Sequence, residues 1–311
     1  MELSVIIPIY NEEVNIDMLY QRLKTVISAI TPDHEFVFIN DGSKDNSLQL
    51  LYKLAQHDPS VRYINFSRNF GHQIAVTAGL DKCLGNAVVI IDADLQDPPE
   101  LIAEMYQKMK EGYEVVYAKR RSRQGEGFLK KFTAKMFYRT LGSLTSISIP
   151  VDTGDFRIVD RKIVDVLKQM PEQQKFLRGQ ISWIGFNQTY VEYDRQERHG
   201  GKTGYTYKKM IRLALDGITS FSNAPLKFAT LSGFIVSGIA FLIMLYALYS
   251  RFVLKDYVPG WTSLILSVMF IGGIQLISIG IIGEYISRIS TNIRNRPLYI
   301  VNDTNCEKNM D

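Results

Sequence analysis

The chain has 311 residues, 46% of them hydrophobic, and a formal net charge of +4. Its length suits one large or two modest domains. Its two cysteines exclude a disulfide framework or a zinc-ligand spacing and favour a reducing compartment. No GxGxxG fingerprint follows the first strand pattern and no GxxxxGK[ST] motif occurs, which disfavours a dinucleotide-binding fold of that type or a P-loop. Met1 leads directly into a strand pattern, so we expect no signal peptide.

Short apolar strands alternate with helical patterns in the N-terminal part of the chain. The expected strands cover residues 3–9, 35–39, 61–66, 88–91 and 115–118, and each ends in polar residues. This alternation predicts a doubly wound α/β domain with a mostly parallel sheet. Because ligands bind at the carboxyl ends of strands in such sheets, the polar residues that end these strands should share one edge and form the site.

The fourth expected strand ends in Asp92-Ala93-Asp94, and Asp97 follows shortly after. Three carboxylates so close together would repel one another without a cation. Hard divalent ions take oxygen ligands and bridge to substrate phosphates, so these residues favour a metal–diphosphate site. The alternative is an acidic β–α turn in which an aspartate caps the following helix.

A basic block follows the fifth expected strand. Lys119 to Arg139 contains eight basic residues against Glu126 alone, which suits phosphates or an anionic membrane surface. Within it, residues 128–139 interleave basic and apolar side chains and predict an amphipathic helix in a membrane interface, with an ordinary core-packing helix as the alternative. Residues 207–222 repeat this pattern, so a second interfacial amphipathic helix is expected to run along the membrane surface into the first span.

Two uncharged stretches, residues 228–250 and 261–283, are each long enough to cross a bilayer as a helix. Two spans return the chain to the same side, and arginines follow the second, so we expect a transmembrane hairpin with both termini cytoplasmic. Glycines in the second stretch allow close helix contact or a homo-oligomer. The expected organisation is a catalytic domain over 1–205, a juxtamembrane helix over 206–227, two helices within 228–284 and a tail over 285–311, partly disordered after Pro297.

Six motifs stand in order along the chain: VIIPIYNEE, INDGSKDNS, SRNFGHQIAVTAG, IDADLQDPPE, YAKRRSRQGE and DTGDFRIVDRK. With them the sequence resembles the family 2 glycosyltransferases of the GT-A fold. More closely, it resembles the polyprenyl-phosphate branch, which includes bactoprenol glucosyltransferases and dolichol-phosphate mannose synthases. The resemblance covers essentially the whole chain and implies an α/β, Rossmann-like GT-A domain joined to the transmembrane hairpin.

The resemblance implies a nucleotide pocket lined by Pro8, Tyr10 and Glu12, with Asp41 hydrogen-bonded to the base. An anionic acceptor strengthens a hydrogen bond from a pyrimidine N–H, and a simple turn aspartate is the alternative for Asp41. Asp94 would hold Mg²⁺ or Mn²⁺ against the diphosphate, where the metal neutralises charge on the leaving group. Asp92 would face the ribose or the metal. The further residues implied for the nucleotide-sugar are Ser43, Ala93 and Gln96.

Asp155 lies near the sugar by resemblance, at a position often treated as an acid or base. A lipid phosphate is already anionic near neutral pH, so it needs positioning more than deprotonation. We therefore expect Asp155 to orient the acceptor, organise Arg157 or bind sugar hydroxyls. The alternative is a helix N-cap ahead of residues 158–167. The catalytic residues that the resemblance implies are Asp155, Asp94 and Arg157.

Four arginines are implied for the acceptor phosphate, because the guanidinium fork suits phosphate oxygens. They are Arg120, Arg123, Arg178 and Arg198. Arg198 belongs to a glycine-rich loop, residues 195–207, which we expect to close over donor and acceptor.

Together these features predict a metal-dependent, inverting glycosyltransferase that moves one sugar from a UDP-sugar to undecaprenyl phosphate for cell-envelope glycosylation. Glucose is the first choice, with GlcNAc or another sugar as the alternative. A processive synthase is disfavoured because Gln174 and Arg178 do not form a QxxRW motif, and a catalytically silent nucleotide-binding scaffold is the alternative from another class. We expect a multi-pass protein of the cytoplasmic (inner) membrane with no nucleic-acid partner. A flippase and a downstream transferase are partners implied by resemblance alone.

Overall fold

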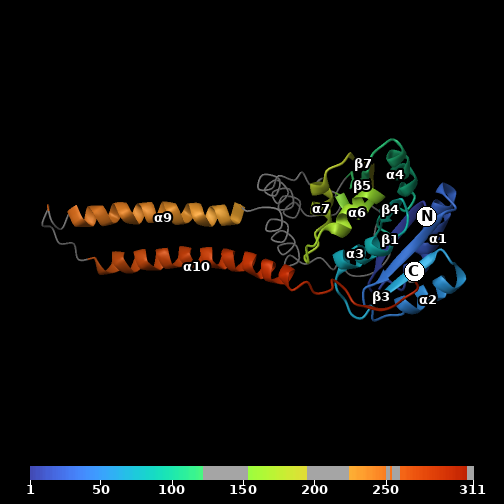
Figure 1. The fold of residues 1–311 in the computed structure, drawn as a ribbon, viewed down its shortest axis with the longest axis horizontal. Coiled ribbons are helices and arrows are strands. Elements are labelled where there is room, and N and C mark those ends of the chain that lie inside the picture. Colours follow the sequence, from blue (N-terminus) through green and yellow to red (C-terminus); the bar gives the residue numbers. More distant parts are fainter. Residues whose placement is uncertain (122–152, 195–223, 250–252, 254–259, 307–311) are drawn as a thin grey trace. The chain divides into compact units, whose positions relative to one another are not determined.

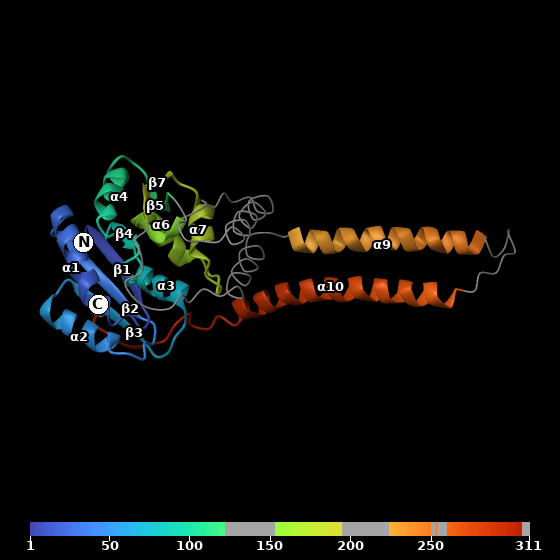
Figure 2. The ribbon, with the colours of Figure 1, turned by 180° about the vertical axis from the view of Figure 1, so that it is seen from behind.

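The computed structural model describes residues 1–121, 153–194, 224–249, 253 and 260–306. The described residues fall into an α/β unit and a separate pair of long helices (Figures 1 and 2). In chain order the α/β unit contains β1 (Leu3–Ile9), α1 (Ile16–Ile30), β2 (His34–Asn40), α2 (Ser47–His57), β3 (Val61–Phe66), α3 (His72–Lys82), β4 (Ala87–Ile90), α4 (Leu101–Lys110), β5 (Val115–Arg120), β6 (Thr153–Asp160), α6 (Arg161–Gln169), α7 (Leu177–Ile184), β7 (Gln188–Tyr193) and β8 (Val301–Thr304).

The strands form one eight-stranded sheet in the order β7-β5-β6-β4-β1-β2-β3-β8. Four neighbouring pairs are parallel, namely β1–β2, β1–β4, β2–β3 and β5–β7. The strands β6 and β8 run against their neighbours. The predicted α/β fold with a mostly parallel sheet is confirmed, and so are its five predicted strands. The strands β6, β7 and β8 were not predicted.

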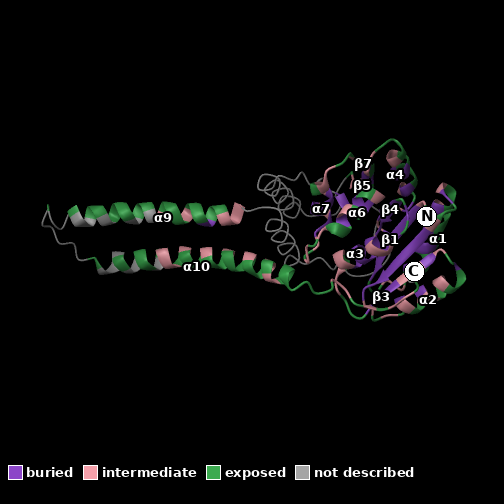
Figure 3. Cartoon of the chain, in the orientation of Figure 1, coloured by how far each residue is buried: buried purple, intermediate pink, exposed green. Residues whose placement is uncertain are grey.

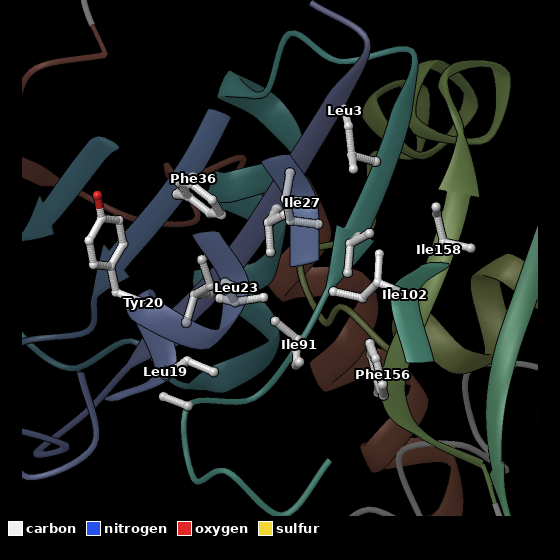
Figure 4. Close-up of a cluster of buried hydrophobic side chains, with 14 of the residues drawn as sticks. Leu3, Leu19, Tyr20, Leu23, Ile27, Phe36, Ile91, Ile102, Phe156 and Ile158 are labelled. Atoms are coloured by element: carbon white, nitrogen blue, oxygen red, sulfur yellow. The ribbon is translucent and has the colours of Figure 1, made fainter. Parts of the chain in front are cut away.

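The central strands are buried on both faces, as a near-continuous apolar sequence requires in a parallel sheet. Side chains alternate along β1, so Leu3 and Val5 pack against the layer of α1, α2 and α4, whereas Ile6 packs against that of α3, α6 and α7. Figure 4 shows part of the first cluster, where Leu23 and Ile27 of α1 lie near Phe36 of β2. Helices thus cover both faces of the sheet, and the ends of its strands are left to form a site.

The helix pair consists of α9 (Ala224–Tyr249) and α10 (Trp261–Ile293), which lie side by side in both views. Most apolar residues of this pair whose burial is described are exposed (Figure 3). By length and composition, Ala224–Ile243 and Phe270–Ile293 are candidate membrane spans. The helices predicted over 228–250 and 261–283 are therefore present over their described residues, and α10 continues past 283. The amphipathic helices predicted at 128–139 and 207–222 lie outside the described residues.

The segment after Pro297, expected to be partly disordered, contains β8, so that expectation is wrong for Val301–Thr304. β8 pairs antiparallel with β3 at the edge of the sheet. The ring of Tyr299 stacks on that of Phe66 with centroids 5.1 Å apart, and its hydroxyl donates to Asp81 at 3.0 Å. The chain that leaves the α/β unit ahead of α9 therefore returns to the same unit after α10.

Candidate active site

The start of β6 lies at the same edge of the sheet as the carboxyl ends of the parallel strands. β6 runs antiparallel to β5, and its first residue, Thr153, pairs with Lys119 near the end of β5. Asp155, two residues further along β6, is thereby placed at the edge that Asp92 and Asp94 reach after β4. The topology brings Asp155 to the same edge as the pair Asp92 and Asp94, which lies far from it in the sequence.

The alternative of a helix N-cap for Asp155 is wrong. The helix α6 begins at Arg161, and Asp160 caps it by accepting a hydrogen bond from the Lys162 N–H at 2.9 Å. The residues just before it are strand, because Ile158 is buried and paired with both β4 and β5. The apolar spacing that suggested an earlier helix start belongs to a strand with two buried faces.

Cationic side chains surround the Asp155 carboxylate. Arg178 Nε donates to its Oδ1 at 2.8 Å, and Arg157 Nη2 reaches the same oxygen at 3.2 Å. His72 Nε2 lies 3.2 Å from Asp155 Oδ2 and 3.6 Å from Asp92 Oδ1. His72 was not among the predicted site residues. Its only signal was its position after the third strand, within the motif SRNFGHQ.

The charges in this cluster shift one another's pKa values. Burial opposes ionisation of Asp155, but the Arg178 charge and the His72 hydrogen bond outweigh it and hold the pKa of Asp155 well below its usual range. Burial likewise lowers the pKa of His72, yet the Asp92 charge and the bond to Asp155 raise that pKa to about 9. Burial and the neighbouring carboxylates raise the pKa of Asp92 to about 6. At neutral pH Asp155 is therefore anionic, and the charges of Asp92 and Asp155 favour the cationic form of His72.

Arg157 is the most deeply buried side chain that contacts this cluster. Its side chain is only 1% exposed, and its guanidinium lies 5.3 Å from the centre of the Tyr117 ring. It donates to the Gly154 carbonyl at 2.9 Å as well as to Asp155. Burial lowers the pKa of Arg157. The contact is compatible with the expectation that Asp155 organises Arg157, which stays a prediction.

Arg120 is held at the end of β5 by a buried acid. Its Nη2 lies 3.8 Å from Asp97 Oδ1, and its Nε donates to the Tyr193 hydroxyl at 3.2 Å. Tyr193 in turn donates to Asp97. A Cβ placed on Gly154 would lie 3.1 Å from Arg120 Nη2, so this arginine approaches the backbone next to Asp155 closely. Arg120 and Arg178 thus share the site, whereas Arg123 and Arg198 lie outside the described residues.

On the other half of the sheet, the loops after β1 and β2 are joined by hydrogen bonds. The Asn11 N–H donates to Ser43 Oγ at 3.0 Å, and the Lys44 N–H donates to Asn11 Oδ1 at 2.7 Å. Gly42, between them, has φ +67°, and a Cβ there would lie 2.6 Å from the backbone of Arg68. Glycine is required by both the backbone conformation and the close approach.

The other residues implied for the nucleotide lie around these loops. Pro8 is buried in β1 and Tyr10 is 44% exposed just after it. The Glu12 carboxylate accepts from Asn15 Nδ2 at 2.6 Å. Asp41 is buried and accepts from the N–H groups of the loop that leads to His72, those of Phe70 at 2.6 Å and Gly71 at 3.0 Å. Burial raises the pKa of Asp41.

The carboxylates after β4 suit a divalent cation. Asp92 Oδ1 is buried and accepts no hydrogen bond from the described residues. Asp94 is 7% exposed and accepts from the Gln96 N–H at 3.2 Å, with Ala93 buried between the two acids. Within the described part of the chain no three acidic, histidine or cysteine side chains are grouped as a metal cage. Mg²⁺ commonly uses one or two carboxylates and completes its shell with waters and substrate phosphates, which this pair fits.

Residues 4–167 match the model of the Glycosyl transferase family 2. The chain belongs to this family. It is 54% identical over 301 residues to the uncharacterized glycosyltransferase YkcC of Bacillus subtilis (strain 168), covering 97% of this chain and 93% of that protein. It is 41% identical over 301 residues to the bactoprenol glucosyl transferase of Shigella phage SfII, covering 97% of each. The predicted family and the predicted enzyme class, a glycosyltransferase, are confirmed.

Among solved structures, the chain is similar to glucosyl-3-phosphoglycerate synthase from Mycobacterium tuberculosis in complex with uridine-diphosphate. The identity is 16% and the TM-score 0.48, over 70% of this chain and 78% of that chain. It is also similar to TarS of S. aureus in complex with UDP, at 20% identity and a TM-score of 0.43, over 62% and 61% of the two chains.

Proposed function

We propose that this glycosyltransferase moves glucose from UDP-glucose to a polyprenyl phosphate, with inversion at the anomeric carbon. One observation carries the proposal: the carboxylates after β4 lie beside the cationic cluster of His72, Arg178 and Arg157 around Asp155. The first group suits a cation bound to a diphosphate, and the second suits an anionic acceptor. The relatives named bactoprenol glucosyl transferase support the choice of sugar and lipid.

In the proposed reaction an oxygen of the acceptor phosphate attacks C1 of glucose while the bond between C1 and the UDP oxygen breaks. The attacking oxygen is already anionic, so no proton has to be removed. Asp155, whose pKa lies well below its usual range, is a poor base at neutral pH. Its contribution is to fix Arg178 and His72 so that they orient the acceptor phosphate beside the donor.

Asp92 and Asp94 would hold Mg²⁺ or Mn²⁺, which neutralises charge on the leaving diphosphate when bound. Tyr10, Asp41 and Ser43 would bind the nucleoside at the adjoining half of the sheet edge. The nearby loop of Phe70 and Gly71 links the two groups, because it donates to Asp41 and leads into His72. Donor and acceptor residues are thus parts of one continuous edge.

The proposed location is the cytoplasmic membrane, with α9 and α10 as a hairpin of two spans. The chain leaves the α/β unit before α9 and rejoins its sheet through β8 after α10. Two crossings return a chain to the side from which it started, so this connectivity supports both termini on the side of the catalytic unit. The proposed use of a cytosolic sugar nucleotide makes that side the cytoplasm. A homo-oligomer, a flippase and a downstream transferase stay predictions.

The test uses the purified full-length protein in detergent with undecaprenyl phosphate, Mg²⁺ or Mn²⁺, and a panel of radiolabelled UDP- and GDP-sugars. We expect label in the organic phase from UDP-glucose alone. Loss of label with EDTA is also expected. Label from UDP-GlcNAc instead would correct the sugar. Nucleotide binding without transfer from any donor would overturn the proposal and favour a silent scaffold.

A further inference from the structure

A row of polar side chains crosses β2, β3 and β8, on the side of the sheet whose loops are proposed to bind the UDP-sugar. Asn40 of β2 pairs in register with Asn65 of β3, and Asn65 with Asp303 of β8. Asn40 and Asn65 are only 2% and 5% exposed, so they are polar groups inside an apolar sheet. Buried amides are costly unless they are hydrogen-bonded, which makes the partners of this row informative.

The row is a directed chain of hydrogen bonds that ends on a carboxylate. The Ser43 N–H donates to Asn40 Oδ1 at 3.3 Å, and Asn40 Nδ2 donates to Asn65 Oδ1 at 2.9 Å. Asn65 Nδ2 then donates to Asp303 Oδ1. Asp303 also accepts from the Tyr52 hydroxyl at 2.7 Å, which fixes its orientation. Hydrogen bonds arranged head to tail polarise one another, so an acceptor oxygen at residue 303 orients both amides of the row.

The series of hydrogen bonds begins at Ser43, a residue of the candidate nucleotide pocket. Ser43 Oγ accepts from the Asn11 N–H at 3.0 Å, so the same residue ties the loop after β1 to the loop after β2. The last member comes from the segment that follows the second candidate membrane span. The donor loops are therefore connected through three side chains to residues near the far end of the chain.

We propose that Asp303, through Asn65 and Asn40, positions the donor loop at Ser43 and so sets the affinity for the nucleoside diphosphate. Asp303 is a positioning residue that does not touch the substrate. The inference rests on the proposed function insofar as Ser43 binds the UDP moiety. The C-terminal segment then contributes to UDP binding, in addition to pairing with the edge strand β3.

A purely structural role for β8 predicts something different. In that case any substitution that weakens the docking of β8 would affect the donor site to the same extent. Thr304 provides the matched control, because its Oγ1 donates to the Tyr63 carbonyl at 2.6 Å and accepts from the Cys306 N–H at 2.9 Å. It anchors the same strand to β3 without belonging to the row of Asn40, Asn65 and Asp303.

The test measures UDP binding by calorimetry and donor kinetics on the full-length protein in detergent. For Asp303→Ala we expect UDP binding to weaken by about three- to tenfold, the scale set by a buried amide that loses its partner. The KM for UDP-glucose should rise by a similar factor, whereas kcat at saturating donor should stay nearly unchanged. This is the pattern expected when binding is weakened equally in the ground state and the transition state. Asp303→Asn retains an acceptor oxygen and should restore most of the affinity, whereas Thr304→Val should leave it unchanged.

Hydrogen exchange gives a readout that needs no nucleotide. The Ser43 amide should exchange faster in Asp303→Ala than in the wild type, and Thr304→Val should not change it. Equal loss of UDP affinity and of Ser43 protection in both variants, or no change of either in Asp303→Ala, would overturn the inference. Wild-type protein that binds UDP without transferring sugar would overturn only the proposed function. If the wild-type protein binds no UDP, the exchange rate of the Ser43 amide in the two variants tests the inference by itself.

Discussion

The two halves of the candidate site are built from different kinds of polar contact. Around the loops after β1 and β2, amides, hydroxyls and backbone N–H groups bind one another, as Asn11, Ser43 and Asn40 do, and the Asp41 carboxylate accepts from backbone N–H groups. We call this the neutral half because neutral groups donate these hydrogen bonds. Around the ends of β4 to β7, ionised groups face one another, with Asp155 between His72 and Arg178. Neutral hydrogen bonds hold a shape at any salt concentration. Paired charges create a field that depends on ionic strength and pH.

This difference matches what each half would bind in the proposed reaction. A nucleoside presents directional N–H and hydroxyl groups, and a pre-formed neutral frame recognises it without moving. A diphosphate and a lipid phosphate present charge, which needs countercharges that are already oriented. Substitutions in the charged half should therefore reduce turnover strongly, and those in the neutral half should change donor affinity modestly.

The largest effect is expected for Asp94→Ala. Stabilisation of the leaving diphosphate by a metal is worth several kcal/mol, so kcat/KM should fall by roughly a thousandfold or more. Initial rates across a Mg²⁺ and Mn²⁺ titration measure this loss of kcat/KM. The matched control is Asp17→Asn, which removes an exposed carboxylate from α1 and should leave kcat/KM unchanged. Activity of Asp94→Ala within tenfold of wild type, with unchanged metal dependence, would remove Asp94 from the metal site.

A smaller but still large loss is expected for Asp155→Asn. The variant keeps the shape of the side chain and removes the charge that holds Arg178 and His72, so the acceptor phosphate is misplaced and kcat should fall by about a hundredfold. Single-turnover rates with pre-bound UDP-glucose isolate this step. Because Asp155 is not expected to accept a proton, added formate or acetate should not rescue the variant. Rescue by such small carboxylate bases would show that Asp155 acts as a base instead.

A change of about tenfold is expected in the acceptor KM of Arg178→Lys. A lysine keeps the charge but loses the fixed guanidinium that donates to Asp155, and a charged hydrogen bond of this kind is worth about that factor. The donor KM should stay within twofold of wild type. Raising salt from about 0.05 to 0.5 M should weaken acceptor binding. Acceptor binding that does not respond to salt would contradict a charged acceptor site.

The sequence predicted the part of the site that follows from local pattern. The strands β1 to β5 are apolar runs that end in polar residues, and Asp92 and Asp94 stand at the end of the one that is central. A parallel sheet then requires their ends to meet. The position of these carboxylates could thus be inferred before any tertiary contact was known.

The rest of the site depends on pairings between distant segments. β6 carries a buried arginine, Arg157, and an apolar spacing that also fits a helix, and only its antiparallel insertion between β4 and β5 brings Asp155 to the edge. β8 has the polar sequence VNDT and is held by its pairing with β3 and by hydrogen bonds from side chains. His72 gains a role solely from the two acids that approach it.

The smallest effect on activity is expected for an ionised residue outside the site, Asp58 on the neutral half. Burial opposes its ionisation, but hydrogen bonds from Lys24, at 2.8 Å, and Tyr20 outweigh it and hold the pKa of Asp58 well below its usual range. Asp58→Asn should lower the unfolding temperature at pH 7 by about 3–8 °C, from about 1–2 kcal/mol, without changing either KM.

The pH dependence of this loss follows from the sign of the shift. A carboxyl whose pKa is lower in the folded than in the unfolded chain stabilises the fold fully above its unfolded value of about 3.9 and loses that contribution as pH falls toward the folded value. The gap in unfolding temperature between wild type and Asp58→Asn should therefore be constant from pH 7 to 5 and narrow below pH 4. Thermal unfolding in detergent at a series of pH values measures it. A gap that widens in acid would mean that Asp58 does not stabilise the fold as an anion.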